Sequence, residues 1–343
     1  MITIKDIAQI SGYSISTVSR VINNRSDVSD EAREKIESII HEQNYQPNEN
    51  ARMLKQTVSS EISVIVRGNK SIFLESILEE IQIRMGKHGE NVNVHFIGET
   101  DDEVATAIQV GQSFKPKGFI FLGGSADHFR EEFSGISLPS VLVTVDASGF
   151  GYDNLSSFTT DDEDAAGCAA GRLLSRGHRR IGILGGYLSD RSGEYEDNYR
   201  TLRIRGAVKE LEKHGISFDF EKDYEPCAFS AESGYPAAER LLSRSPDLTA
   251  VFALNDGVAV GAIRAFRDRG LDVPGNISVV GFNGVSYVRF LNPRLATIRQ
   301  DTAMLARKSV DDLLLRISYG SPAIHEKIPY EYFDGESVAP PCK

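Results

Sequence analysis

Apolar residues near the amino terminus recur with helical spacing in three short segments. We predict helices over residues 4–10 and 15–22, and a third that begins after Ser29 within the first 45 residues. Ser14 and Ser29 stand directly before two of these segments, where a hydroxyl can accept hydrogen bonds from the free backbone N–H groups of a helix start. The apolar positions supply a small core: Ile7, Ala8, Val18, Val21, Ala32, Ile36 and Ile40.

From residue 62 the pattern changes to alternating strands and helices. Apolar runs of strand length lie at 62–66, 92–97, 118–122, 141–145, 181–184, 250–254 and 277–281. Helical periodicity lies between them, over about 73–87, 103–112, 163–176, 200–214, 232–243 and 258–269. Continuous apolar strands that alternate with helices are typical of parallel sheets covered on both faces, and we predict two such α/β units.

A short polar region separates these two patterns. Pro47 interrupts the chain, residues 48–55 are long enough for one or two helical turns, and residues 56–61 are polar. We therefore predict three parts: an all-α headpiece at 1–46, a hinge helix and linker at 47–61, and a two-lobed α/β domain at 62–343.

Composition excludes several classes of protein. Of the 343 residues, 41% are hydrophobic and 25% charged, which are ordinary values for a folded globular chain. No apolar run reaches the length of a membrane span, and the first residues lack the apolar core of a signal peptide. The three cysteines are far apart and form neither a disulfide framework nor a metal-binding pair, so we expect a reducing, cytoplasmic location.

The charge distribution alone does not indicate a nucleic-acid partner. Net charge is −11; through Val58 there are seven basic and eight acidic residues, so −1 belongs to the amino-terminal part and −10 to the rest. DNA binding by this chain therefore depends on where individual charges lie rather than on a basic domain.

Residues 12–23 carry the most specific local pattern. A helix-turn-helix motif needs a tight turn and then a helix whose first residues reach base edges in the major groove. Ile15, Ser16 and Arg20 share one face of the second predicted helix. Short polar side chains suited to phosphate oxygens surround them: Ser14, Thr17, Ser19 and Asn23. A generic three-helix module with polar helix ends is the alternative.

Motifs along nearly the whole chain resemble one family. In the first part they are residues 3–8, 12–23, 44–48 and 51–54; in the second they include 177–181, 232–235, 255–256, 277–282 and 297–300. In this order they resemble the lactose/galactose repressor (LacI/GalR) family of transcription regulators. The resemblance implies a sequence-specific DNA-binding regulator, most simply a repressor, whose DNA-contacting positions are Thr3, Ser14, Ile15, Ser16, Thr17, Ser19, Arg20, Asn23, Ser29, Tyr45, Asn48, Ala51 and Leu54.

The resemblance also implies how the headpiece acts on DNA. Residues that match Ile15, Ser16 and Arg20 read the major groove in this family, and the residue that matches Leu54 is a wedge inserted into the minor groove. The hinge helix of the family orders when a dimer sits on its operator, so we expect a homodimer and a pseudo-palindromic site. The alternative for Leu54 is a linker leucine that packs on the headpiece.

Several polar and aromatic residues follow predicted strands, where ligands bind in open α/β sheets. The resemblance implies a sensor domain like periplasmic sugar-binding proteins, with the effector between two lobes. It assigns to the effector site Phe73, Asp146, Arg203, Phe229, Asn255, Asn283 and Gln300. Arg203 matches an arginine fork and Phe229 an aromatic platform. The alternatives are a surface ion pair for Arg203 and a core role for the phenylalanines.

Asn283 departs from the family pattern, which usually has an acidic residue at this position. An asparagine keeps one acceptor and adds donors, but it carries no charge. We expect a sugar or sugar-phosphate effector that releases the operator; a purine co-repressor that stacks on Phe229 is the alternative.

The sequence contains no pattern that indicates an enzyme or a metalloprotein. There is no nucleophile–base–acid order, no complete phosphate-binding loop and no histidine pair at metal-ligand spacing, so we predict no catalytic residues, metal or cofactor. The acidic run 161–164 lacks the spacing of a calcium site and is better placed as a helix start. A sugar-binding transport protein would need a signal peptide and no headpiece, which is the reverse of this chain.

Overall fold

The computed structural model describes residues 4–22, 28–43, 61–68, 71–187 and 198–342. The chain divides into two compact units, Met1–Ser59 and Ser60–Lys343, which are described separately. The predicted headpiece boundary at residue 46 and residues 47–60 of the predicted hinge lie outside the described residues.

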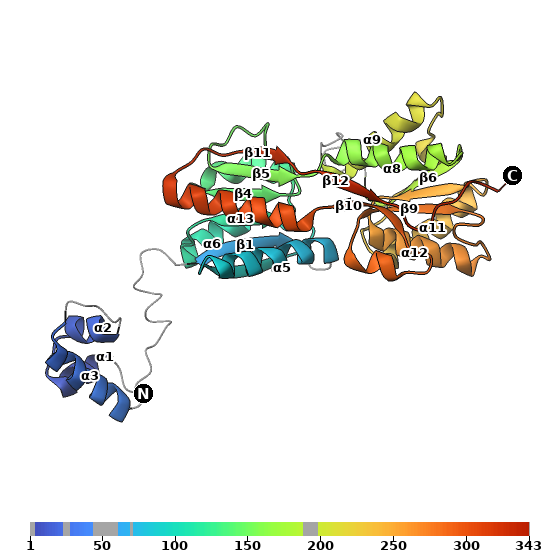
Figure 1. Ribbon diagram of the computed structural model, residues 1–343. Coiled ribbons are helices and arrows are strands. Elements are labelled where there is room, and N and C mark those ends of the chain that lie inside the picture. Colours follow the sequence, from blue (N-terminus) through green and yellow to red (C-terminus); the bar gives the residue numbers. More distant parts are fainter. Residues whose placement is uncertain (1–3, 23–27, 44–60, 69–70, 188–197, 343) are drawn as a thin grey trace. The chain divides into compact units, whose positions relative to one another are not determined.

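The first unit contains three helices around a small core (Figure 1). They are α1 (Ile4–Ser11), α2 (Ile15–Ile22) and α3 (Asp30–Glu42). The Ser14 hydroxyl accepts a hydrogen bond from the Thr17 N–H at 3.1 Å, and Ser29 caps α3 by accepting from Ala32 N–H. All the predicted core residues are buried except Ile40, which is half-buried because it lies near the end of α3.

The second unit begins with a lobe built on a six-stranded sheet in which all strands run parallel, in the order β11-β5-β4-β3-β1-β2. Its strands are β1 (Glu61–Arg67), β2 (Asn91–Ile97), β3 (Phe119–Leu122), β4 (Ser140–Val143), β5 (Leu155–Thr159) and β11 (His325–Lys327). Its helices are α5 (Ile72–Lys87), α6 (Glu103–Phe114), α7 (Ala126–Glu132), the short η1 (Phe133–Gly135) and α13 (Thr302–Tyr319).

The other lobe contains a second six-stranded sheet, in the order β12-β10-β9-β8-β6-β7. Its strands are β6 (Ile181–Leu184), β7 (Tyr224–Glu225), β8 (Ala250–Ala253), β9 (Ser278–Asn283), β10 (Ala296–Gln300) and β12 (Tyr330–Phe333). Its helices are α8 (Asp162–Ser175), α9 (Tyr199–Lys213), α10 (Phe220–Asp223), α11 (Ala231–Arg244), α12 (Asp256–Asp268) and the short η2 (Ser286–Phe290). Only β12, paired with β10, runs antiparallel.

Both sheets are covered on both faces, as predicted from their continuous apolar strands. In the first lobe α5 and α13 pack on one face, and α6 and α7 on the other. In the second lobe α8 and α9 cover one face, and α11 and α12 the opposite face. In the central strands β3 and β8, and in β1 between its two ends, side chains are buried whichever way they point, so these strands read as nearly unbroken apolar runs.

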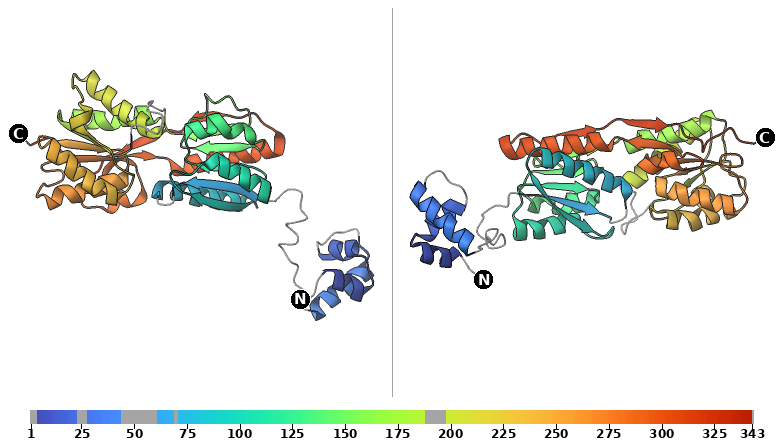
Figure 2. Two further views of the ribbon diagram at one scale, coloured as in Figure 1. Left: turned by 180° about the vertical axis from the view of Figure 1, so that it is seen from behind. Right: turned by 60° about the horizontal axis from the view of Figure 1, so that its bottom comes forward.

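Three connections join the lobes, which lie end to end in two views (Figures 1 and 2). The chain enters the second lobe between β5 and α8, returns between β10 and α13, and crosses again between β11 and β12. Strands β5, β7, β10, β11 and β12 and helices α7, α10 and α13 were not predicted. Within the described residues, no helix is long and apolar enough to cross a membrane.

Helices α8 and α9 approach each other at backbone distance. Small residues line α8, including Ala166, Gly167 and Ala170, and a Cβ at Gly206 of α9 would overlap the backbone carbonyl of Glu163. Gly206 therefore fixes how closely the two helices pack.

We expect Gly206→Ala to lower the free energy of unfolding by about 1–3 kcal/mol, since the added methyl group must push two helix backbones apart. The matched control is Gly86→Ala in α5, where an added Cβ would meet nothing within 4 Å. That control should be neutral or raise stability by up to about 1 kcal/mol, through helix propensity. Urea unfolding followed by circular dichroism tests both; equal effects of the two substitutions would contradict the packing argument.

Candidate functional site

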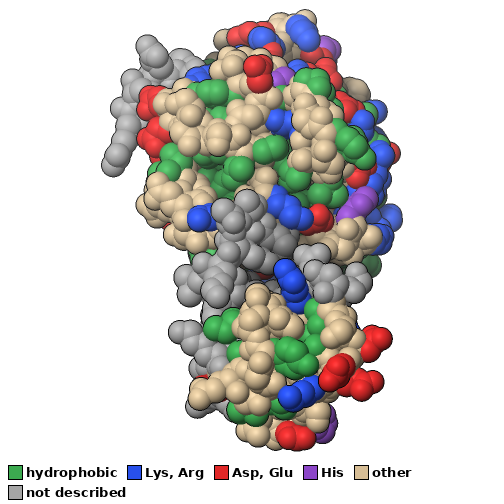
Figure 3. All heavy atoms as spheres, turned by 90° about the vertical axis from the view of Figure 1, so that its left-hand side faces the viewer, with side chains coloured by type: hydrophobic (Ala, Val, Ile, Leu, Met, Phe, Trp, Pro, Cys, Tyr) green, Lys and Arg blue, Asp and Glu red, His purple; other side chains and the backbone are tan. Residues whose placement is uncertain are grey.

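One face of α2 is exposed and carries the predicted DNA-reading residues. Val18 and Val21 are buried in the headpiece core, which orients the helix. Ile15, at 42% exposure, Ser16 and Arg20 are consequently turned toward solvent. Figure 3 shows both acidic and basic side chains on the visible face of this unit, in keeping with its near-zero net charge.

The remaining headpiece residues divide into capping groups and half-buried groups. The Ser14 hydroxyl bonds the hydroxyls of Ser16 and Thr17, at 2.7 and 2.8 Å, in addition to its capping bond. Thr17 and Ser19 are half-buried, and Ser29 is exposed at the start of α3. Six predicted contacts lie outside the described residues: Thr3, Asn23, Tyr45, Asn48, Ala51 and Leu54.

In the second unit, Arg203 of α9 is buried and held on three sides. Its Nε donates to Asp162 Oδ1 at 2.7 Å, and its Nη1 donates to the Leu254 carbonyl at 2.7 Å. The guanidinium carbon lies 3.8 Å from the centre of the Phe282 ring. Arg203 is therefore an internal ion-pair partner rather than a surface one, and it lies at the carboxyl ends of β8 and β9.

Asn283 and Gln300 form a neutral pair at the ends of β9 and β10. Gln300 Nε2 donates to Asn283 Oδ1 at 2.9 Å, and both residues are 4% exposed. The backbone φ of Asn283 is 106°, a conformation that residues other than glycine rarely adopt. The pair presents uncharged donors and acceptors where the family pattern usually has a carboxylate.

Phe229 lies beside Tyr199, with ring centroids 5.9 Å apart, and the Arg200 guanidinium is 5.7 Å from the Phe229 ring. Tyr199 also lies 5.3 Å from the Arg203 guanidinium. Asn255 caps α12 through its amide oxygen, which accepts from the N–H groups of Gly257 and Val258, so its amide nitrogen takes no part in the cap. Phe229, Arg203 and Asn255 thus belong to one end of the second sheet.

The two predicted effector residues of the first lobe, Phe73 and Asp146, do not lie with the second-lobe residues. Phe73, in the first turn of α5, is 6% exposed and packs in the core, which is the alternative expected for a phenylalanine after a strand. Asp146 is exposed, and its carboxylate accepts from the Ser148 N–H at 2.9 Å. It lines a groove of about 740 Å³, formed by both lobes, together with Tyr199 and Lys327; the other six predicted effector residues do not line this groove.

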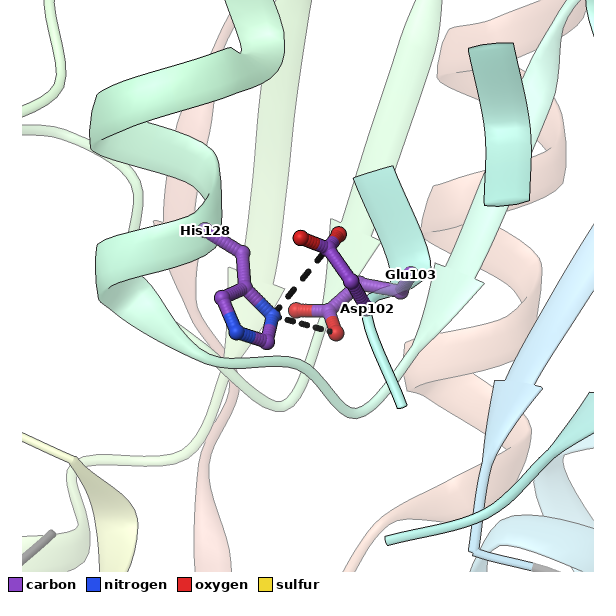
Figure 4. A group of neighbouring side chains, drawn as sticks. All are labelled: Asp102, Glu103 and His128. Carbon is purple, nitrogen blue, oxygen red and sulfur yellow. Dashed lines mark hydrogen bonds and ion pairs between the residues drawn. The ribbon is translucent and has the colours of Figure 1, made fainter. Parts of the chain in front are cut away.

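A cluster of Asp102, Glu103 and His128 in the first lobe brings together groups that could hold a metal (Figure 4). Its oxygens already have partners: Asp102 caps α6, and Glu103 accepts from Ser125 N–H and lies 3.1 Å from His128 Nδ1. The Arg67 guanidinium lies 3.6 Å from Glu103 and supplies the compensating charge. The arrangement is that of an internal hydrogen-bond network which fixes the loop after β3.

The sequence analysis missed three residues of the second-lobe site: Asp162, Tyr199 and Asp256. Tyr199 lies one helical turn before Arg203, a spacing that could have revealed it. Asp162 was included only as part of a helix start. Asp256, 1% exposed, accepts from Thr297 Oγ1 at 2.6 Å and from Val285 N–H at 2.9 Å, and so holds the loop that carries Asn283.

Burial raises the pKa of Asp256 to about 7, although its hydrogen bonds to Thr297 and the 284–285 backbone oppose the rise. A pKa raised in the folded state means that the folded chain binds the proton more tightly than the unfolded chain. This contribution to stability is present at low pH and is lost as pH rises through about 7.

We expect the free energy of unfolding of the wild-type chain to fall by about 2 kcal/mol more than that of Asp256→Asn between pH 5 and pH 8. Urea unfolding at several pH values measures this difference. Asp268→Asn on the same helix is the control, because an aspartate ordinarily titrates below this range and hydrogen bonding to Arg264 lowers the pKa of Asp268 further. Parallel pH curves for the wild type and Asp256→Asn would contradict the expected coupling.

Comparison with known proteins agrees with this architecture. Residues 3–48 match the model of bacterial regulatory proteins of the lacI family, and residues 170–338 match a periplasmic binding protein-like domain. The chain is 34% identical to the HTH-type transcriptional regulator MalR of Clostridium butyricum, over 97% of this chain and 98% of MalR. It is 31% identical to the ribose operon repressor of Haemophilus influenzae, over 92% of each chain.

The structure also superposes on a solved relative. A crystal structure of the lac repressor dimer bound to operator and the anti-inducer ONPF matches with a TM-score of 0.80 at 27% identity, over 98% of this chain and 99% of that one. The order of the motifs, the helical headpiece, the two sheet-based lobes and the sequence identities all indicate the same family. The chain is a DNA-binding transcription regulator rather than an enzyme, and it belongs to the LacI family of bacterial regulatory proteins.

Proposed function

We propose that this regulator is a repressor of a carbohydrate-utilisation operon, which binds a pseudo-palindromic operator as a homodimer and is released by a sugar or sugar phosphate. It would act in the cytoplasm, at the nucleoid when bound to its operator. The observation that carries the DNA-binding half is the exposed face of α2, where Ile15, Ser16 and Arg20 stand opposite a buried valine pair. A rigid helix face of this kind fits the major groove.

The second lobe supports the proposal of a sugar effector. A pyranose has an apolar face that can stack on Phe229 and a rim of hydroxyls that can bond amides and a guanidinium. Asn255, Asn283 and Gln300 supply such amides beside Arg203. One relative, the ribose operon repressor of Haemophilus influenzae, is named for a sugar operon, which is consistent with this class. A purine stacked on Phe229 remains the second candidate.

Arg20 is proposed to read a base in each half-site. Arg20→Ala should weaken operator binding by about 1–3 kcal/mol per half-site and relax preference at one position, where wild type favours guanine. Selection of binding sites from random DNA, followed by mobility shift, measures both effects. Arg33→Ala removes the same charge from α3, where Arg33 pairs with Glu37, and should leave base preference intact. Unchanged preference for Arg20→Ala would refute this assignment.

Arg203 is proposed to bind effector and not DNA. Arg203→Ala should keep operator affinity and abolish release by sugar, a coupling on the order of 1–3 kcal/mol. Because alanine leaves Asp162 buried without its partner, Arg203→Gln is measured beside it as the less disruptive variant. Operator titration with and without a panel of sugars is the experiment. Variants that lose operator binding but retain sugar affinity would show that the roles of the two units are assigned wrongly.

A further inference from the structure

Asp162 differs from its acidic neighbours in the direction its side chain takes. Asp161 bonds Lys327 at 2.6 Å, Glu163 bonds Arg205 at 2.7 Å, and Asp164 accepts from the Tyr330 hydroxyl at 2.5 Å. Asp162, the first residue of α8, turns inward and bonds Arg203 at 2.7 Å. Within this run of four acidic residues, Asp162 is thus the one paired with the arginine of the proposed effector site.

The Asp162–Arg203 pair removes the net positive charge from that site. Both side chains are only 5% exposed, so the pair is shielded from water and its electrostatic interactions are strong. Arg203 therefore already has an acidic partner, Asp162, before any ligand arrives.

The amide groups of the site carry no charge, so they do not alter the balance of charge between Arg203 and Asp162. Asn283 and Gln300 bond each other, and Asn255 offers an amide nitrogen after capping α12. A sugar hydroxyl can accept a hydrogen bond from Arg203 while the ion pair with Asp162 stays intact. A phosphate would instead compete with Asp162 for the same guanidinium, and its charge would be repelled by the buried carboxylate.

We propose that Asp162 is a specificity-determining residue, which acts through Arg203 to make the site select neutral over anionic ligands. The inference rests on the proposed sugar-effector function and narrows it: the effector is a neutral sugar, and sugar phosphates are rejected. Asp162 also fixes the guanidinium orientation, so it is a positioning residue for the contact that Arg203 makes.

The experiment compares neutral sugars with their phosphates on the full chain. Isothermal titration uses D-glucose and glucose 6-phosphate, D-ribose and ribose 5-phosphate, and maltose and maltose 6′-phosphate. In the wild type, any sugar that binds should do so at least about tenfold more tightly than its phosphate, which corresponds to about 1.4 kcal/mol. This measurement requires no variant, and so it does not depend on how a substitution affects folding.

The variant Asp162→Asn keeps an oxygen acceptor for Arg203 Nε and removes the charge. We expect it to raise affinity for the sugar phosphate by about tenfold or more and to change affinity for the neutral sugar by less than about threefold. If the role of Asp162 were purely structural, the substitution would weaken the binding of both ligands and leave the ratio of their affinities unchanged. Glu163→Gln is the matched control. It removes the same charge from the next position of α8, but the Glu163 side chain bonds Arg205 and Lys209 instead of Arg203.

The outcomes separate this inference from the proposed function. If no sugar or sugar phosphate binds the wild type, the sugar-effector function fails and this inference fails with it. If the phosphate binds as tightly as its sugar, the effector function stands and charge selection by Asp162 is wrong. If Asp162→Asn leaves the ratio of the affinities for sugar and sugar phosphate unchanged, charge selection by Asp162 is also wrong. That result would be expected if the phosphate were held by Arg200, which lies over Phe229. A ratio shifted equally by Glu163→Gln would contradict a specific role for Asp162.

Discussion

Parallel strand pairing is the constraint on which the regulator's second unit depends. Two parallel strands cannot be joined by a tight turn, so each connection must cross a face of the sheet, usually as a helix. That requirement buries both faces of each sheet and brings the carboxyl ends of neighbouring strands to one edge. Strands β9 and β10 end at this edge with Asn283 and Gln300. Helices α12 and α9 begin there and bring Asn255 and Arg203, although up to 97 positions separate these residues in the chain.

The central strands and most of the helices that cover them could be predicted from sequence because their patterns are regular. β5 could not, since two of its five residues are serines; they are buried because Arg316 and His325 bond their hydroxyls. The short strands β7, β11 and β12 depend on sheet partners distant in the chain. Helix α13 did carry a usable signal, because Leu305, Ala306, Val310 and Leu313 are apolar residues at helical spacing, a pattern that the prediction did not use.

The site was predictable only as a set of residues, not as an arrangement. Resemblance to the LacI family placed Arg203, Asn283 and Gln300 in the effector site, but no local pattern connects Arg203 with Asp162, 41 positions earlier. Nor does any local pattern connect Asn283 with Gln300, or Asp256 with the loop near residue 284 that it holds. Phe73 shows the reverse: its position after a strand fitted a ligand contact, yet its side chain fills the core.

The close approach of α8 and α9 has a consequence for how this scaffold can be redesigned. Asp162 begins α8 and Arg203 lies in α9, so the ion pair bridges two helices whose backbones touch at Gly206. Their spacing is set by glycine and alanine rather than by long side chains that could repack. Substitutions that keep the size of a side chain, such as Asp162→Asn, therefore leave this interface in place, whereas larger side chains where α8 and α9 meet would force the two helices apart.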